Sequence, residues 1–242
     1  MLRREGPGVD VLVLLSFGFE WRIGDATDPS RPWERPGSFV AGLREGAVLT
    51  EHDGRSYGMQ ISLTPPGAYA LLGMPMHELA GRTIALDAVL GAHADRLTER
   101  LAELDDWGRR FELLDAALAA RLDGAGTPSP AVVWAWRRLS GAHGRVPIGR
   151  LAHELGWSRK RLAARFRDEV GLPPKSLARL LRFERAKALL EGDDRPGLAR
   201  LARECGYYDQ AHLTNEFRCI TGTTPAAYAA ETNLQDALAA RS

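Results

Sequence analysis

The sequence predicts an α+β protein in which a small β-sandwich or barrel-like domain with helices precedes an all-α domain. Three observations lead to this fold class. Short apolar runs alternate with turn residues from about residue 9 to residue 72, as in sandwiches and barrels. Apolar residues at helical spacing take over from about Met76. A seven-residue pattern then occurs twice in the second half, which indicates one structural unit built twice.

The first region should begin with a buried strand and continue with shorter ones. Val9–Phe17 is a dense run of β-branched residues and leucine, which is typical of a buried strand. A loose loop is expected from Asp25 to Pro36, with turns at Asp53-Gly54 and Pro65-Pro66-Gly67. The barrel should be irregular or incomplete, because the segment is short and the chain begins almost on a strand. The other expected strands are Trp21–Ile23, Ser38–Leu43, Ala47–Thr50, Ser56–Leu63 and Ala68–Leu72.

Helices are expected over about residues 76–122. Their predicted segments are His77–Leu79, Ile84–Leu90 and a long stretch from Ala92 to Leu122. This stretch carries an apolar stripe that could pack on the barrel or form a dimer contact, and Gly108 and Asp115 interrupt any heptad, which favours the core. The stripe consists of Leu97, Leu101, Leu104, Phe111, Leu114 and Leu118. Asp123–Pro130 is rich in Gly, Pro and Ser and predicts a linker over residues 123–130, after which Val132–Ser140 should be helical.

The repeated pattern reads LAHELGW at Leu151–Trp157 and LARECGY at Leu201–Tyr207. Leu, Ala, Glu, Gly and an aromatic residue recur in register. Each copy is followed by Leu and Phe, and then by Gly-x-x-Pro. These later matches are Leu162, Phe166, Gly171 and Pro174 in the first copy, and Leu213, Phe217, Gly222 and Pro225 in the second.

Each copy predicts two short helices joined by a tight turn, which is a helix-turn-helix. Gly156 and Gly206 follow apolar helical stripes, where a positive φ would end the first helix. Ser158 and Asp209 are good N-caps for the second helix. The two units should span about residues 148–170 and 198–220. Two parallel copies are hard to explain as generic helix packing.

Pro174–Glu191 predicts a helix that joins the two units. Its apolar residues lie on two faces, as expected for a helix packed against both units. Eighteen residues of helix span about 27 Å at 1.5 Å per residue. This length could place two recognition helices near one helical turn of DNA apart, roughly 34 Å.

Charge is distributed unevenly along the chain, although the whole sequence carries only +1. Residues 1–127 hold 13 basic and 19 acidic residues, a net charge of −6. Residues 128–232 hold 18 basic and 11 acidic residues, a net charge of +7. A basic region that contains the helix pairs, attached to an acidic region, is typical of a nucleic-acid-binding protein with a second domain.

The stretch from about Pro147 to Tyr228 resembles the DNA-binding domain of the AraC-type (AraC/XylS) transcriptional regulators. The likeness is most specific around Asp209–Arg218, which reads DQAHLTNEFR, and covers about a third of the chain. It also includes Ala202, Gly206, Tyr207, Gly222, Pro225 and Tyr228. The resemblance implies a DNA-binding domain at residues 131–232. By analogy, residues 1–122 would form a cupin-like sensor or dimerisation domain.

Recognition helices present their N-terminal turns to base edges. The resemblance marks the positions of Lys160, Ala163 and Ala164 as groove-facing, and alanine offers only contact with a thymine methyl group. Arg159, Lys160 and Arg165 should therefore supply mainly affinity for the DNA backbone.

In the second unit, Gln210 and Asn215 can pair with adenine, although relatives often carry Arg at the place of Asn215. His212 should reach a phosphate or a base rather than a metal. The expected DNA-contacting residues are Ser158, Arg159, Lys160, Arg161, Ala164, Arg165, Gln210, Ala211, His212, Thr214, Asn215 and Arg218, with Gly156 and Gly206 as structural turns.

An enzyme is not favoured, and no catalytic residue, metal or cofactor is expected. No two of the six His have H-x-H or H-E-x-x-H spacing, and no Gly-rich phosphate loop is present. Cys205 and Cys219 both lie in the second unit, with Cys205 expected to be buried, and two free thiols fit a reducing cytosol. The apolar run near the N-terminus is too short for a signal peptide or a membrane span.

These observations favour a cytoplasmic, nucleoid-associated transcriptional regulator controlled by an unknown small-molecule effector. Its expected partners are operator or promoter DNA, RNA polymerase and a second copy of the chain, with no membrane. An activator is expected, although the sequence leaves the choice between activation and repression open. Two alternatives stay open: a ligand-independent regulator whose first domain only dimerises, and a small-molecule enzyme with an accessory DNA-binding domain.

Overall fold

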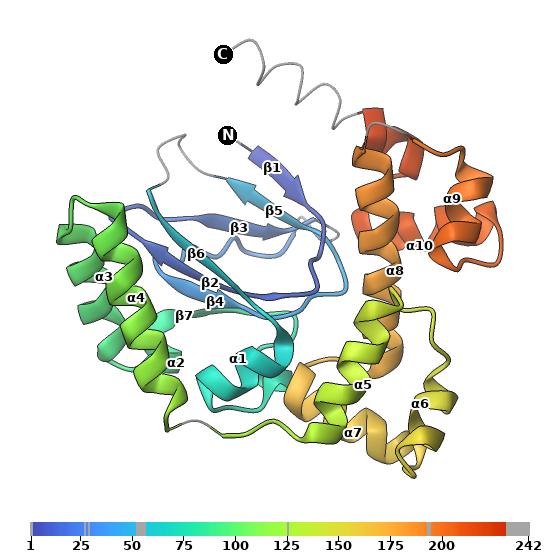
Figure 1. Ribbon diagram of the computed structural model, residues 1–242. Helices are drawn as coiled ribbons and strands as arrows, with labels where there is room; N and C mark the ends of the chain where they lie inside the picture. Colours follow the sequence, from blue (N-terminus) through green and yellow to red (C-terminus); the bar gives the residue numbers. More distant parts are fainter. Residues whose placement is uncertain are drawn as a thin grey trace.

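The apolar runs of the first region form two antiparallel sheets, so the predicted combination of a sandwich-like region with a helical region is confirmed (Figure 1). The computed structural model describes residues 2–26, 28, 30–51, 57–124, 126–192 and 195–230. The expected turn at Asp53-Gly54 and the start of the strand expected at Ser56 lie outside these residues. One sheet has the order β1-β5-β3, with β1 at Leu2–Glu5, β5 at Val48–Glu51 and β3 at Arg22–Asp25. The other has the order β6-β2-β4-β7, with β6 at Gly58–Leu63, β2 at Val11–Ser16, β4 at Phe39–Ala41 and β7 at Thr83–Ala85.

Strand β2 shows how the layers are built. Successive side chains of a strand point to opposite faces of a sheet. Val11, Val13 and Leu15 join the large core that the helices cover, whereas Leu14 belongs to a separate small cluster with residues of the other sheet. The long apolar run therefore serves two layers, which explains why it lacks the alternation of a half-exposed strand.

Helices cover the outer face of the β6-β2-β4-β7 sheet and one of its ends (Figure 1). The longest of these helices, Trp107–Leu122, is joined to the helix before it by a buried cation. Arg110 is only 2% exposed, and its Nε donates to the Leu101 carbonyl at 2.9 Å. Its guanidinium also lies 4.5 Å from the centroid of a Trp107 ring. The helical elements are α1 at Pro65–Leu72, the 3₁₀ helix η1 at Met76–Glu78, α2 at Leu86–Leu90, α3 at His93–Glu103 and α4 at Trp107–Leu122.

The strand expected at Ala68–Leu72 is wrong, because this segment is part of α1. Thr64 caps the helix, since its hydroxyl accepts the Gly67 N–H at 3.3 Å. Pro65 and Pro66 occupy the first helical positions, where the missing N–H costs nothing. The Pro-Pro-Gly segment therefore begins a helix instead of making a turn between strands.

The single helix expected over Ile84–Leu90 is also wrong in its first residues. Thr83–Ala85 forms β7, which pairs with β4, and α2 begins only at Leu86. The sequence of this segment suits either state, and pairing with a strand far away in the chain decides between them.

All regular secondary structure in the described part of the second half is helical. Helix α8 spans Pro174–Glu191, the same residues that the apolar pattern predicts for the connector. Gly156 and Gly206, at the predicted turns, have φ values of +63° and +78°. Residues 225–230 are also helical. The other helices are α5 at Pro130–Gly141, α6 at Ile148–Glu154, α7 at Arg159–Val170, α9 at Leu198–Cys205 and α10 at Gln210–Thr221.

One large core joins the sheets to the first helix-turn-helix unit. It extends from β2 through α5 and α7 to Leu181 of α8, and a separate core from Phe183 to Ile220 serves the second unit. The expected linker includes Ala125, which lies outside the described residues. The end of this linker contacts α7, because the Ser129 N–H donates to the Glu169 carboxylate at 2.7 Å. The division at residues 123–130 therefore stays a prediction. None of the described helices is long and apolar enough to cross a membrane.

Candidate nucleic-acid interface

The two predicted helix-turn-helix units have the same backbone hydrogen bonds at their turns. In the first unit, the Trp157 N–H donates to the Ala152 carbonyl at 2.9 Å. In the second, the Tyr207 N–H donates to the Ala202 carbonyl, also at 2.9 Å. The repeat seen in the sequence is thus a repeat of backbone geometry, with a glycine of positive φ just before each aromatic residue.

The second helix of each unit begins at the predicted cap. The Ser158 hydroxyl accepts the Arg161 N–H at 3.1 Å, and Asp209 Oδ1 accepts the His212 N–H at 2.7 Å. Both helices end at a left-handed glycine, Gly171 after α7 and Gly222 after α10. The two candidate recognition helices therefore have twelve residues each and the same signals at both ends.

The first turn of α7 is exposed and positively charged. Arg159, Lys160 and Arg161 are all exposed, while Leu162 and Phe166 of the same helix are fully buried. Arg161 lies over Trp157, with 4.5 Å between the guanidinium carbon and the ring centroid. Among the described residues, Arg159 and Lys160 make no ion pair. This turn can therefore offer its charge to a phosphate backbone.

Arg165, one turn further along α7, is already paired. Its guanidinium contacts the carboxylate of Glu169, which is fully buried, and lies 3.8 Å from Asp168. Burial raises the pKa of the Glu169 carboxyl, while the Ser129 N–H and Arg165 lower it. Arg165 thus stabilises a buried acid, and it has less charge to offer DNA than Lys160.

The first turn of α10 is exposed but nearly neutral. Gln210, Ala211 and Asn215 are exposed, and Thr214 is half-buried with its hydroxyl donating to the Gln210 carbonyl at 2.9 Å. Arg218 is exposed two turns further on. Amides at the start of a recognition helix are suited to reading adenine. Ala164 of α7 is exposed as well, as its expected role requires.

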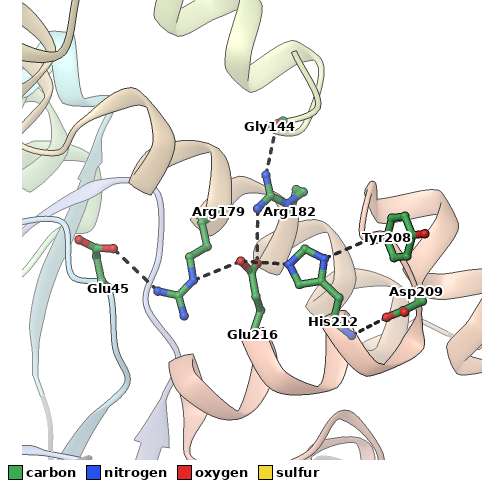
Figure 2. A network of polar contacts seen from close by, with 8 residues as sticks. All are labelled: Glu45, Gly144, Arg179, Arg182, Tyr208, Asp209, His212 and Glu216. Atoms are coloured by element: carbon green, nitrogen blue, oxygen red, sulfur yellow. Dashed lines mark hydrogen bonds and ion pairs between the residues drawn. The ribbon is translucent and has the colours of Figure 1, made fainter. Parts of the chain in front are cut away.

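His212 sits within a polar network that crosses the molecule (Figure 2). Its Nδ1 accepts the Tyr208 N–H at 3.3 Å, and its Nε2 lies 3.5 Å from Glu216 Oε1. Glu216 is also contacted by two arginines of α8, Arg179 at 3.7 Å and Arg182 at 3.4 Å. Both ring nitrogens of His212 therefore have neighbours within the protein, which orient the exposed ring on α10, and its contact with DNA stays a prediction.

The same network reaches the sheets. Arg179 lies 3.9 Å from Glu45, which precedes β5, so a chain of charges runs from the first half through α8 to α10 (Figure 2). Arg182 also donates to the Gly144 carbonyl at 3.5 Å, which connects α8 to the turn after α5.

Both candidate recognition helices contact the first half at their C-terminal ends. The Ala47 N–H donates to the Ile220 carbonyl at 2.8 Å, and Arg4 donates to the Thr221 carbonyl. At the end of α7, a Cβ added at Gly171 would lie 3.0 Å from the Met76 carbonyl oxygen, so the end of α7 and the η1 segment are in contact there. Their N-terminal turns remain exposed, which is the arrangement that entry into a groove requires.

Sequence reasoning missed Tyr208 as a candidate contact. Its side chain is 93% exposed and stands beside the turn of the second unit. Tandem aromatic residues before an N-cap could have revealed it, because only one of them is needed for the core, and Tyr207 is the buried one. A tyrosine hydroxyl can donate to a phosphate oxygen.

The two cysteines of the second unit differ in burial. Burial raises the pKa of the Cys205 thiol to about 11, so this cysteine is a packed apolar residue, as expected. Cys219 is exposed. Among the described residues, no group of three His, Cys, Asp or Glu side chains is arranged to hold a metal ion.

Comparison with known proteins places the second half in a described family of domains. Residues 151–231 match the family model of a helix-turn-helix domain. No curated protein matches the chain.

Several solved structures resemble the chain. The C-terminal domain of AraT, a response regulator from Geobacillus stearothermophilus, is 22% identical, with 44% of this chain and 88% of that chain covered and a TM-score of 0.41. The DNA-binding domain of AdpA, solved in complex with a target DNA, is 27% identical, with 44% and 96% covered and a TM-score of 0.41. Apo ToxT from Vibrio cholerae is 10% identical, with 95% and 92% covered and a TM-score of 0.50, and this likeness concerns the fold alone.

Proposed function

Starting from the AraC-type helix-turn-helix domain that residues 151–231 form, we propose that the chain is a sequence-specific transcriptional regulator controlled by a small-molecule effector. One observation carries the DNA-binding part. Two units of equal backbone geometry stand at the two ends of α8, and each exposes the first turn of its second helix (Figure 1).

The roles of the two helices follow from their exposed residues. Arg159 and Lys160 on α7 would contact phosphates and supply affinity that depends on salt. Gln210 and Asn215 on α10 would read base edges, with Tyr208 against the backbone. Ser158, Arg161, Ala164, Ala211, Thr214 and Arg218 would line the remaining contact surface.

Operator selection with the full-length protein tests this function. Double-stranded DNA retained from a random library should converge on a site with two half-sites about one helical turn apart. Arg159→Ala combined with Lys160→Ala should weaken retention of every sequence. The matched control is Arg96→Ala combined with Arg100→Ala on α3, which removes the same charge from the first half and should leave retention unchanged. Failure of the wild type to retain any duplex at low salt would refute the proposal.

Control by an effector is supported by a cavity of about 250 Å³ between the two sheets. Residues of both sheets line it, and so does Glu184 of α8, the helix that connects the two DNA-binding units. An occupant would thus touch the element that sets the spacing of the recognition helices. Ala41→Phe would fill the cavity from β4. A regulator controlled through this cavity should change its operator affinity, whereas a ligand-independent regulator should not.

A dimerisation role for the first half has its own support. Trp107 and Phe111 of α4 are 42% and 55% exposed, and they lie next to each other with ring centroids 6.1 Å apart. Sedimentation analysis of the Phe111→Ser variant tests this role, because a dimer formed through α4 should dissociate at higher concentration than that of the wild type. Equal dissociation would place the contact elsewhere.

A further inference from the structure

The cavity between the sheets is lined by both apolar and charged residues. Its walls include Leu12 and Leu14 of β2, Ile23 of β3, Phe39 of β4 and Val48 of β5. Leu14, Ile23 and Phe39 form a small cluster between the sheets that is separate from the large core. Its volume of about 250 Å³ is slightly below the usual range for drug-sized ligands, about 300 to 1,000 Å³, and suits a smaller molecule.

The ionisable residues that line the cavity carry an excess of negative charge. Glu5, Asp10 and Glu184 are acidic, and Arg44 is the one basic residue among the described lining residues. Burial lowers the pKa of Arg44, but the protein already supplies its partners, because it donates to the Thr83 hydroxyl and lies within electrostatic reach of Glu34 and Asp25. The Glu5 carboxylate is likewise occupied, since it accepts the Thr50 hydroxyl at 2.9 Å.

Asp10 and Glu184 are the acids that remain. They line the cavity from different parts of the chain, Asp10 from the loop after β1 and Glu184 from α8, and the charge of Asp10 contributes to raising the pKa of Glu184. The Lys187 ammonium is 3.9 Å from Glu184 Oε1, and Glu191 adds further negative charge from the same helix. Within the described residues, Glu184 Oε1 is buried and accepts no hydrogen bond.

The balance of these groups favours a cation. Burial raises the pKa of both Asp10 and Glu184, so the charged form of each carboxyl is disfavoured, although the Asp10 residue is exposed and Glu184 is half-buried. A positively charged group with N–H donors would supply the missing hydrogen bond and relieve the repulsion between the two carboxylates. A carboxylate on the ligand would instead add to that repulsion.

We propose that the cavity binds a small organic cation, with an ammonium or amidinium group facing Asp10 and Glu184 and an apolar body against Leu12, Leu14 and Phe39. This inference rests on the proposed function, in which the cavity is the effector site. Binding would draw the loop of Asp10 towards α8, because the cation attracts both carboxylates. The ligand would thereby act on the helix that connects the two DNA-binding units.

Three probes of nearly equal shape test the charge of the ligand: 2-phenylethylamine, 3-phenylpropionate and 2-phenylethanol. Calorimetry on the full-length protein at neutral pH should give the lowest Kd for the amine. Glu184→Gln should raise that Kd about tenfold, as expected for the loss of one partly buried ion pair. Asp10→Asn should act in the same direction. Glu99→Gln, on the exposed face of α3, is the control and should leave Kd unchanged.

Every outcome bears on the ligand class. Preference for the carboxylate or the alcohol overturns it, and so does the absence of amine binding at millimolar concentration. An equal Kd for the wild type and both cavity variants would also overturn it. Because the two substitutions keep the shape of the side chain, a melting curve without ligand shows whether each variant is folded. Retention of operator DNA is measured separately, so the ligand class can fail while the DNA-binding function stands, and the reverse.

Discussion

The two helix-turn-helix units share a backbone but differ in what surrounds them. The first is packed into the same core as the sheets, through Leu162, Phe166 and Val170 of α7. The second has a core of its own, in which Phe217 packs against Phe183 with 5.0 Å between ring centroids. Their exposed surfaces differ too, since α7 begins with three cations and α10 with uncharged side chains that can form hydrogen bonds.

From this difference we infer that the first unit would supply general affinity for DNA and the second would read the base sequence. A unit that shares its core with the sheets could supply affinity that is the same for all sequences, because contacts of charged side chains with phosphates need little geometric precision. A unit that meets the first half through a few polar contacts can adjust its position on DNA, and amides read bases only when they are well placed. The charge chain from Glu45 through Arg179 to Glu216 would influence that position.

The largest expected effect comes from replacing one buried phenylalanine in each unit with alanine, in two separate variants. Phe166→Ala and Phe217→Ala should each cost about 3–5 kcal/mol of unfolding free energy, because both side chains are fully buried. Hydrogen exchange should separate them. Phe166→Ala should reduce protection in α1 and β2 as well as in α7, whereas Phe217→Ala should reduce it only in α9, α10 and the end of α8. Equal loss in β2 for both variants would break the comparison.

Base reading should depend on α10. Asn215→Ala should change the preference at one base of the operator by about 1–3 kcal/mol, since an amide can pair with adenine through two hydrogen bonds. Competition between operator variants measures this change. The control is Cys219→Ser, an exposed position one turn later, which should leave the preference as it is. Uniform weakening on all operators would assign Asn215 to the backbone instead.

Phosphate affinity should depend on the first turn of α7. Lys160→Ala should weaken binding equally on all sequences and lower the slope of log K against log salt by about one. Its melting temperature should not change. Arg165→Ala should instead lower the melting temperature, because it leaves the buried charge of Glu169 without its partner. DNA titrations at several salt concentrations, together with melting curves for both variants, decide whether Lys160 and Arg165 differ in this way.

The smallest effect concerns Glu184 without ligand. Burial raises the pKa of this carboxyl in the folded state, so its contribution to stability is present below the ordinary pKa of 4.5 and is lost as the pH rises through the folded value. Glu184→Gln should therefore raise the melting temperature slightly at pH 7, and the gain should disappear in acid. The same variant should bind the amine probe less well. Melting curves across pH check the sign, and a variant that is less stable at pH 7 would contradict it.

The helix-turn-helix units could be predicted from the sequence because local residues determine them. Gly156 and Gly206 permit the turn, Ser158 and Asp209 cap the next helix, and the stripe of Leu and Phe defines the buried face. None of these signals depends on a residue far away in the chain. Domain boundaries and base contacts are still predictions, since they depend on neighbours and on DNA.

The features that the sequence did not indicate depend on long-range contacts. Arg110 is charged, and charge predicts a surface position, yet the Leu101 carbonyl and the ring of Trp107 solvate it inside the protein. The cavity unites Leu14 of β2 with Glu184 of α8, and no local pattern connects them. Thr83–Ala85 is a strand only because β4 lies beside it.

The core shared by the sheets and α7 has a consequence for building chimeras. A fragment that starts at α5 would expose the apolar side of α7 that α1 and η1 now cover, and would tend to aggregate or to adhere to other proteins. Swapping in the first half of a related regulator would require the contact surface to be transplanted with it. Evolution faces the same constraint, so the first half and the first helix-turn-helix unit are expected to be inherited as a pair.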